Sequence, residues 1–223
     1  ANLQYHPFFL NCLLNLASLE KIRYNKVSCW IDPQVYIFLE SETTVMNNIT
    51  LIGMPGAGKS TVGIVLAKVL GYDFIDSDLL IQKQEGKLLW EIMRDEGIDG
   101  FNRIEEQVNS QIHASHSVIS PGGSVIYGAK AMEHLRRIST VIYLKVSCQE
   151  LKKRLGDLNR RGVVLSPGET LEDLYARRTP LYEKYAHIIL EEDQRNIAEV
   201  VRKIQEILSV EEDSSASSRP SLR

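Results

Sequence analysis

Residues 53–60 read Gly53-Met54-Pro55-Gly56-Ala57-Gly58-Lys59-Ser60, and this stretch decides the fold. It matches G-x-x-x-x-G-K-[ST], the P-loop pattern that binds phosphate groups. An apolar run at 48–52 before it predicts a strand, and residues 60–70 after it carry apolar side chains at helical spacing. Because the glycines fall between a strand and a helix, we interpret the stretch as a nucleotide site rather than a chance glycine-rich turn.

The residue types of the loop suit this chemistry. Glycines let the backbone curl so that successive N–H groups face a phosphate, and the helix N-terminus adds partial positive charge. Lys59 would reach the β- and γ-phosphates of ATP, and the Ser60 hydroxyl would bind Mg²⁺. The predicted nucleotide-binding residues of the loop are Gly53, Gly56, Ala57, Gly58, Lys59, Ser60 and Thr61.

The composition is that of an ordinary globular protein. The 223 residues are 25% charged and 43% hydrophobic, with a net charge of −3, which argues against a nucleic-acid binder. The three cysteines form no metal-ligand spacing and fit a reducing compartment, so we expect a cytoplasmic protein. No apolar run is long enough to span a membrane, and the run at 8–14 lacks the basic flank of a signal peptide. We also expect a monomer with a small-molecule substrate.

The chain divides into three parts by pattern. Residues 1–45 precede the P-loop unit and form an N-terminal extension of unknown role. Residues 46–209 form the nucleotide-binding domain. Residues 210–223 are rich in serine and acidic side chains and predict a disordered tail.

Strands and helices alternate along the domain. Further strands are expected at 72–78, 117–120, 140–146 and 187–190, and helices at 79–115 with breaks, 128–137, from 147, 170–186 and 196–208. This alternation predicts an α/β fold with a parallel sheet and helices on both faces. The polar, glycine-punctuated segment from Gly156 to Gly168 predicts a mobile loop.

Two aspartates follow the second expected strand. Asp76 and Asp78 are two residues apart, so on an extended strand they share one face. Ligands of parallel sheets bind at the carboxyl ends of the strands, which would place both carboxylates near the P-loop. One could support Mg²⁺ through water, and the other could accept a proton from a hydroxyl that is being phosphorylated. The competing interpretation is that Asp78 only caps the helix expected from Leu79.

Glycines and arginines complete the candidate site. Gly122 and Gly123 end the third strand and could bring backbone N–H groups to a substrate, although an ordinary turn explains them equally well. The second half of the domain is basic at Arg154, Arg160, Arg161, Arg177 and Arg178. Solvated helix faces explain most of these residues, but an arginine on a closing loop would meet the charge on a transferring phosphate.

These motifs together resemble the shikimate kinase family over about residues 47–208. Besides the P-loop, the matching pieces are Asp76-Ser77-Asp78, Phe101 with Glu105, Gly122-Gly123 and Arg178-Thr179-Pro180-Leu181-Tyr182. The resemblance implies a three-layer α/β/α fold with a five-stranded parallel sheet and a mobile lid. It also implies ATP, Mg²⁺ and transfer of the γ-phosphoryl group to the 3-hydroxyl of shikimate, a step of aromatic amino acid biosynthesis.

The resemblance also implies individual roles. Asp78 matches the carboxylate that contacts the acceptor hydroxyl, and Asp76 matches the carboxylate near the metal. Arg178 matches an arginine that binds the substrate carboxylate, and Arg154 matches one that lies on the adenine face. Arg161 matches the lid arginine near the phosphates. The substrate-binding residues implied are Asp78, Asn102, Gly122, Gly123 and Arg178, and the catalytic ones are Lys59, Asp78 and Arg161.

The acceptor half departs from the family pattern. Where the family has Phe-Arg, this chain has Phe101-Asn102, and Arg103 points about 100° away around a helix. The third glycine of the family is Ser124, and the lid sequence differs at 161–165. Kinase chemistry is therefore better supported than shikimate as the acceptor. The alternatives are another alcohol such as homoserine or a sugar acid, a nucleoside monophosphate, or a nucleotide-binding pseudoenzyme.

Overall fold

The computed structural model describes residues 47–155, 169–193 and 196–217, with the side chains of the last helix described as far as residue 209. The predicted N-terminal extension, 1–45, lies outside the described residues. The same is true of the predicted lid, 156–168, and of its arginines Arg160 and Arg161.

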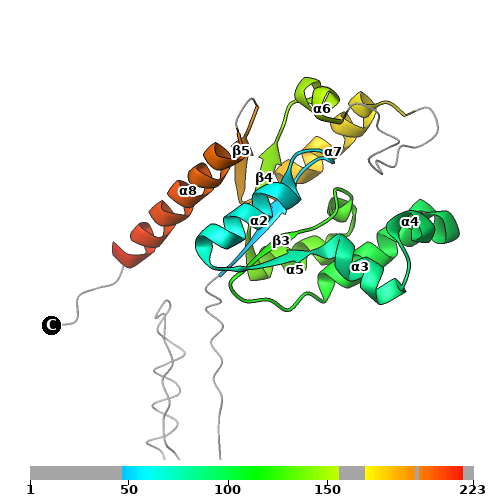
Figure 1. Cartoon of the computed structure of the whole chain (residues 1–223), viewed down its shortest axis with the longest axis horizontal. Coiled ribbons are helices and arrows are strands. Elements are labelled where there is room, and N and C mark those ends of the chain that lie inside the picture. Colours follow the sequence, from blue (N-terminus) through cyan, green and yellow to red (C-terminus); the bar gives the residue numbers. More distant parts are fainter. Residues whose placement is uncertain (1–46, 156–168, 194–195, 218–223) are drawn as a thin grey trace, which may run out of the picture. The chain divides into compact units, whose positions relative to one another are not determined.

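A five-stranded sheet forms the centre of the domain (Figure 1). Its strands are β1 (Asn48–Ile52), β2 (Asp73–Asp76), β3 (Ser117–Ser120), β4 (Ser139–Lys145) and β5 (Ile188–Glu191). They lie in the order β2-β3-β1-β4-β5, and every neighbouring pair is parallel. The predicted parallel α/β sheet is confirmed.

Helices cover both faces of the sheet. They are α2 (Lys59–Leu70), α3 (Ser77–Glu85), α4 (Leu89–Ser110), α5 (Ala129–Ile138), α6 (Cys148–Leu155), α7 (Leu171–Tyr185) and α8 (Ile197–Ser217), with a short 3₁₀ helix η1 (Val125–Tyr127). Helices α2 and α8 pack together on one side, and α5 and α7 pack against β4 from the other. The domain is therefore the three-layer α/β/α arrangement that the resemblance implied.

The central strands are apolar because both of their faces are covered. Leu51 and Ile52 of β1 and Val141 and Ile142 of β4 are fully buried. Parallel strands between two helix layers need such continuous apolar runs. The same packing brings the carboxyl ends of β1, β2 and β3 to one edge of the sheet, next to the P-loop.

The structure corrects the prediction for the two aspartates. Strand β2 ends at Asp76, and Asp78 lies in the first turn of α3 rather than on the strand. Asp76 is the residue that caps the helix, because its Oδ1 accepts hydrogen bonds from the N–H groups of Asp78, at 3.0 Å, and Leu79, at 3.4 Å. Asp78 therefore does not cap α3, and its carboxylate is available to the site.

Two helices also differ from their predicted bounds. The break expected near Gly97 is a kink within α4, where this glycine has φ of 69° and ψ of 179°. Helix α8 runs to Ser217, past the predicted end at 208 and into the segment predicted as a disordered tail. Acidic side chains and serines in that segment do not prevent a helix that is already nucleated by packing from continuing.

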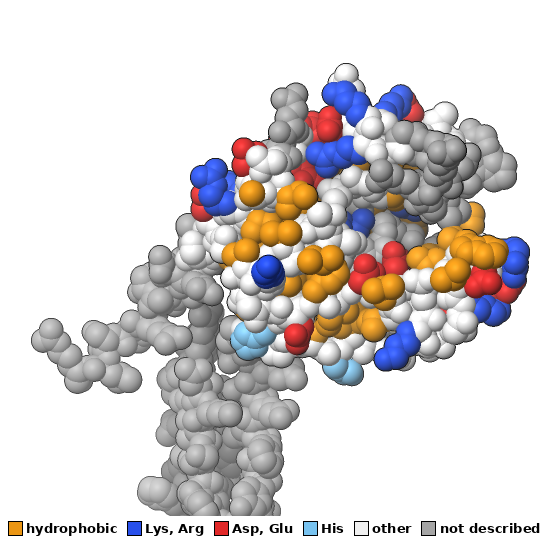
Figure 2. All heavy atoms as spheres, in the orientation of Figure 1, with side chains coloured by type: hydrophobic (Ala, Val, Ile, Leu, Met, Phe, Trp, Pro, Cys, Tyr) orange, Lys and Arg blue, Asp and Glu red, His pale blue; other side chains and the backbone are white. Residues whose placement is uncertain are grey.

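No helix of the described residues is long and apolar enough to cross a membrane. On the face shown in Figure 2, Lys and Arg side chains are mixed with Asp and Glu side chains instead of forming one basic surface.

Candidate active site

The P-loop connects β1 to α2 in a conformation that only glycine tolerates well. Gly53 has φ of 153°, and a Cβ there would lie 2.8 Å from the carbonyl oxygen of Leu144. Gly58 precedes α2 in the left-handed region and offers no side-chain cap to the first turn. The N–H groups that begin this helix are thus open toward a ligand, which suits an anion such as phosphate.

Lys59, the first residue of α2, lies against its own loop. Its Nζ donates hydrogen bonds to the carbonyl oxygens of Gly53, at 3.0 Å, and Met54, at 3.3 Å. Burial lowers the pKa of Lys59 to about 8, with Asp78 chief among the groups that oppose the shift and Arg178 adding to it. A bound polyphosphate would favour the charged ammonium, so the lysine is adapted to a strongly anionic ligand.

A row of oxygen side chains links the P-loop to β2. Asp76 pairs in register with Ser120 on β3, and the Ser120 hydroxyl lies 3.4 Å from that of Ser60. Asp76 uses Oδ1 for the helix cap, which leaves Oδ2 for another partner. Hard oxygen donors of this kind are the ligands that Mg²⁺ prefers, and it takes few of them from the protein. Among the described residues no group of three His, Cys, Asp or Glu side chains forms a metal cage.

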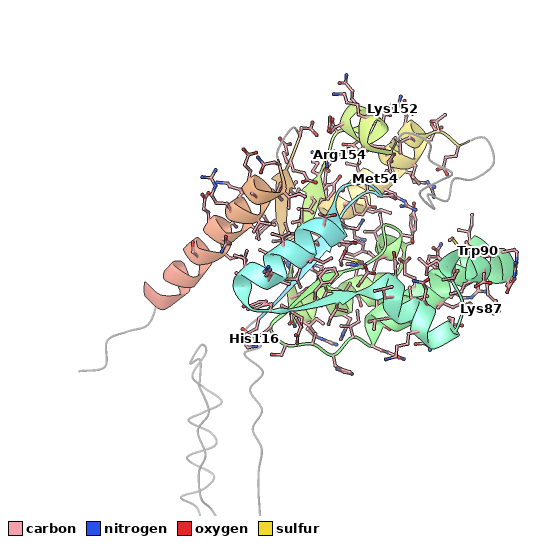
Figure 3. The ribbon with its side chains drawn as sticks, viewed as in Figure 1. Met54, Lys87, Trp90, His116, Lys152 and Arg154 are labelled. Carbon is pink, nitrogen blue, oxygen red and sulfur yellow. The ribbon has the colours of Figure 1, made fainter. Side chains whose placement is uncertain are left out.

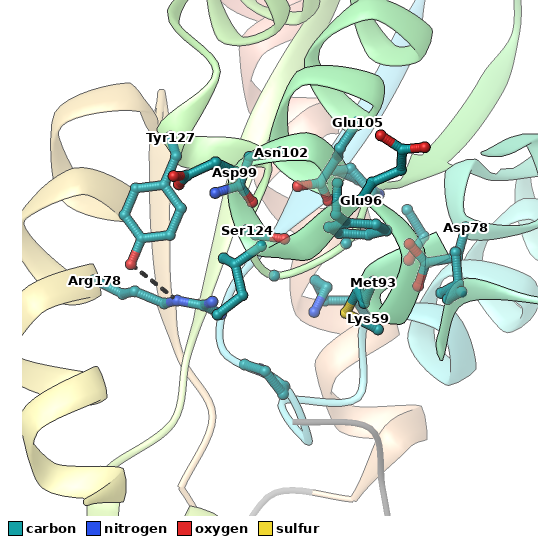
Figure 4. Close-up of a pocket in the computed structure, with 18 of the residues that line it drawn as sticks. Lys59, Asp78, Met93, Glu96, Asp99, Asn102, Glu105, Ser124, Tyr127 and Arg178 are labelled. Carbon is teal, nitrogen blue, oxygen red and sulfur yellow. Dashed lines mark hydrogen bonds between the residues drawn. The ribbon is translucent and has the colours of Figure 1, made fainter. Parts of the chain in front are cut away.

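One cavity of about 950 Å³ contains both the P-loop and the predicted acceptor residues (Figure 4). Of the residues predicted from the sequence, its lining includes Gly56, Lys59, Ser60, Asp78, Asn102, Gly122, Gly123 and Arg178. Burial and the charge of Asp76 raise the pKa of Asp78, while Lys59 opposes them. A carboxylate beside an ammonium in a partly enclosed cavity is positioned to receive a proton from a bound hydroxyl.

Arg178 forms the opposite wall of this cavity. It is only 7% exposed, its Nε donates to the Tyr127 hydroxyl at 3.3 Å, and its guanidinium stacks over the Tyr127 ring at 5.4 Å. Within the described residues no carboxylate lies at ion-pair distance from it. A buried guanidinium that is held in place by an aromatic ring and lacks a carboxylate partner is suited to bind a carboxylate of a ligand.

Gly122 and Gly123 form the floor of this cavity, between Asp78 on one side and Arg178 on the other. A Cβ at Gly122 would collide with Glu105 Oε1 and lie 2.9 Å from Asp78 Oδ1. A Cβ at Gly123 would lie 3.1 Å from Arg178 Nη1. The carbonyl oxygen of Gly123 accepts a 2.6 Å hydrogen bond from the Tyr182 hydroxyl. Glycine is required here because charged groups approach the backbone closely from two sides.

Glu105 lies beneath this floor and is 1% exposed. Its Oε1 has no hydrogen-bond partner among the described residues. Burial raises the pKa of Glu105 to about 7, and the nearby charge of Asp78 adds to this, against a hydrogen bond from Ser124 and the charges of Arg178 and Lys59.

A second cavity of about 480 Å³ lies on the other side of the P-loop. It is lined by Ala57 and Gly58 of the loop, Val62 of α2 and Arg154 of α6, among others. Arg154, labelled on α6 in Figure 3, shares this lining with the P-loop residues Ala57 and Gly58. Glu150 accepts a hydrogen bond from Arg154 Nε at 3.2 Å and holds the guanidinium over this space. An arginine plane at the side of the loop suits a nucleotide base.

A family model for shikimate kinase matches residues 55–209, which is more than half of the chain. The chain belongs to the shikimate kinase family. The shikimate kinase of Clostridium botulinum strain 657 is 42% identical to it over 149 residues, which cover 65% of this chain and 87% of that protein. The shikimate kinase of Mycobacterium marinum is 38% identical over 157 residues, which cover 69% of this chain and 85% of that protein.

Solved structures agree with this family. The shikimate kinase of Acinetobacter baumannii in complex with shikimate has a TM-score of 0.67 at 32% identity, covering 75% of this chain and 96% of that chain. The shikimate kinase of Aquifex aeolicus has a TM-score of 0.62 at 29% identity, covering 75% and 98%. As a shikimate kinase family member, this chain keeps the family fold around an acceptor wall in which Asn102 stands where the resemblance implies arginine.

Some predicted residues do not line the two cavities. Gly53 shapes the loop without lining either cavity, and Thr61 and Asp76 also lie outside both linings. Conversely, the sequence analysis missed Ser120 beside Ser60 and Tyr127 beneath Arg178. Both meet their partners only through the tertiary fold, and their types are common at strand ends and in turns. The serine that ends a strand next to the P-loop was the one available signal.

Proposed function

We propose that this protein transfers the γ-phosphoryl group of ATP to the 3-hydroxyl of shikimate. The observation that carries the proposal is the single cavity in which Lys59 of the P-loop and the buried Arg178 face a common space. One end suits the phosphates, and the other suits a small molecule with a carboxylate. Membership of the shikimate kinase family supports the same donor and acceptor.

On the nucleotide side, the backbone of the P-loop and the start of α2 bind the phosphates. Lys59 would exchange its bonds to Gly53 and Met54 for contacts to the β- and γ-phosphates. Its positive charge stabilises the negative charge that develops on the leaving oxygen, which is the main contribution that a kinase site makes. Arg154 would lie against the base in the second cavity.

Ser60 and Asp76 fit a magnesium ion that accompanies the nucleotide. Ser60 would bind it directly, and Asp76 would hold it through water with the oxygen that the helix cap does not use. Mg²⁺ supplies charge neutralisation of the phosphate oxygens when it is bound.

On the acceptor side, Arg178 binds the carboxylate of shikimate and sets the position of its ring. Asp78 accepts a hydrogen bond from the hydroxyl that attacks and takes its proton as the new bond to phosphorus forms. The backbone of Gly122 and Gly123 lies under the ring. Because Asn102 is neutral, Arg178 holds the substrate carboxylate without a second arginine, so we expect weak binding of shikimate. A monomeric state and a cytoplasmic location remain predictions.

A coupled ADP-release assay with ATP, Mg²⁺ and a panel of hydroxy acids tests this function. We expect turnover with shikimate that is lost in Arg178→Ala, through a rise in KM of about ten- to a hundredfold. Arg94→Ala, which removes an exposed arginine, is the matched control and should behave as wild type. ATP binding without turnover on any acceptor would instead indicate a pseudoenzyme.

A further inference from the structure

Among the described residues that line the acceptor pocket, Glu105 is the one buried ionisable group that the proposed mechanism does not use. It is 1% exposed and lines the cavity, and its Oε1 has no hydrogen-bond partner among the described residues. A buried polar atom without a partner costs free energy, so such atoms are uncommon unless a ligand completes them. The carboxyl group therefore indicates a second recognition point for the acceptor.

The pocket has charges of opposite sign on its two sides. The carboxyl groups of Glu105 and Asp78 lie close to Gly122. The guanidinium of Arg178 lies close to the adjacent Gly123. Groups of opposite charge therefore approach two consecutive residues of the same turn. Figure 4 shows the same division, with Arg178 on one side and Glu105 and Asp78 on the other.

No ion pair joins Glu105 to a cation among the described residues, although the charges of Arg178 and Lys59 act on it from a greater distance. Asn102, one turn before Glu105 on α4, is neutral, and the exposed acids Glu96 and Asp99 also line the cavity. Of the described cations in the lining, Lys59 bonds to the P-loop and Arg177 pairs with Glu169. A ligand with a positive group would give Glu105 the cationic partner that the described residues do not supply.

We propose that this pocket also accepts hydroxy acids that carry an ammonium group, with the carboxylate bound by Arg178 and the ammonium bound by Glu105. The proposal rests on the proposed function, since the acceptor hydroxyl must reach Asp78 as that of shikimate does. The bond from this hydroxyl oxygen to the γ-phosphorus forms while the bond from phosphorus to the bridging oxygen breaks. ADP leaves with that electron pair, and the hydroxyl proton passes to Asp78.

A contact between Glu105 and a ligand ammonium differs from a contact with a neutral hydroxyl, because the ammonium is charged. An ammonium favours the ionised carboxylate and donates a charge-assisted hydrogen bond, which is about twice as strong as a neutral one. Loss of one such contact corresponds to about ten- to a hundredfold in affinity. Shikimate carries no cation, so it cannot form an ion pair with Glu105 when this carboxyl group ionises.

The test compares L-homoserine with 4-hydroxybutanoate, which has the same chain, hydroxyl and carboxylate but no amine. Affinities are measured by calorimetry with the full chain, and turnover by ADP release, at pH 6 and pH 8. Homoserine should bind at least about tenfold more tightly than 4-hydroxybutanoate. This preference should increase with pH, because the pKa of Glu105 is about 7. The charged groups that face Glu105 are Asp78 of α3, Lys59 of α2 and Arg178 of α7.

Two variants assign the effect to this side chain. Glu105→Gln keeps the size but removes the charge, and Asn102→Arg supplies a cation from the protein, so each should reduce the preference for homoserine to near unity. Glu133→Gln makes the same change on the exposed surface of α5 and should keep the preference.

The outcomes distinguish this proposal from the proposed function. Turnover of shikimate together with equal affinities for homoserine and 4-hydroxybutanoate, or no measurable binding of either, would overturn the ammonium site and leave the function intact. A preference for homoserine that Glu105→Gln removes, in an enzyme that ignores shikimate, would support the site and overturn shikimate as the acceptor. A preference that survives in Glu105→Gln would overturn the role of this residue.

Discussion

The Tyr182 hydroxyl donates a 2.6 Å hydrogen bond to the carbonyl oxygen of Gly123, joining α7 to the turn after β3. Tyr182 is fully buried and stacks on Tyr143 of β4, with ring centroids 5.0 Å apart. The tyrosine thus fixes the glycine on which the acceptor would lie to the helix that carries Arg178. Together with the hydrogen bond from Arg178 to Tyr127, this contact joins two parts of the acceptor pocket that are far apart in sequence.

Tyr182→Phe tests this link. The ring is kept, but the hydrogen bond to Gly123 is lost, so the free energy of unfolding should fall by about 1–2 kcal/mol. The acceptor KM should rise while the KM for ATP changes little. Urea denaturation and ADP-release kinetics measure the two effects. Tyr72→Phe removes the hydroxyl of a partly buried tyrosine just before β2 and is the control. Equal stability of both variants would contradict the proposed link.

Lys59→Ala should abolish phosphoryl transfer. This residue is the only P-loop cation, and its loss removes several kcal/mol of transition-state stabilisation, on the order of one positioned electrostatic donor or more. Single-turnover measurements at saturating ATP separate this effect from weaker nucleotide binding. Lys68→Ala, at the exposed end of the same helix, should retain full activity. A Lys59→Ala enzyme with wild-type turnover would exclude the P-loop mechanism.

Asn102→Arg should lower the KM for shikimate by about tenfold or more. Asn102 lines the same cavity as Arg178, so an arginine there would share the substrate carboxylate and also pair with Glu105. Asn102→Gln changes the length of the side chain without adding charge and is the control. An unchanged KM in the arginine variant would show that position 102 does not contact the acceptor.

The stability of the protein should depend on pH through Glu105. Its pKa is about 7 in the folded chain, against an ordinary value of 4.5. Between these values the folded protein holds a proton that the unfolded chain has released. The contribution of Glu105 to the free energy of unfolding therefore falls as pH rises from about 4.5 to 7, by about 3 kcal/mol in total.

Urea denaturation of wild type and Glu105→Gln across this pH range measures the effect. The glutamine cannot ionise, so the difference between the two stabilities should change in favour of the variant as the pH rises. Parallel stability curves would mean that Glu105 is already ionised at pH 5. The pKa of Lys59 is lowered to about 8, so its protonation affects the stability at a higher pH than this range.

Local patterns predicted the fold well, because the elements of this domain are encoded locally. The P-loop, the apolar strands and the helical spacing of α2 each lie within a short stretch of sequence. The position of Asp78 was wrong because the run Asp76-Ser77-Asp78 allows either aspartate to cap a helix, and only the pairing of β2 with β3 shows where the strand ends.

The candidate site was harder to predict from the sequence than the fold, because its side chains meet only in the tertiary structure. By pattern, Gly122 suited a substrate-binding turn and an ordinary turn equally well, and its contacts with Glu105 and Asp78 explain why a glycine is needed. Tyr127 under Arg178 and Ser120 beside Ser60 had no sequence signal of this kind. The predicted roles of the individual site residues remain predictions that the variants above test.

Phosphorus NMR of wild-type protein with ATP, Mg²⁺ and shikimate tests the central claim most directly. We predict a new phosphomonoester resonance that grows in equal amount with ADP and requires shikimate. Unchanged ATP at high shikimate concentration, or ADP accompanied only by inorganic phosphate, would contradict the claim that this site phosphorylates shikimate.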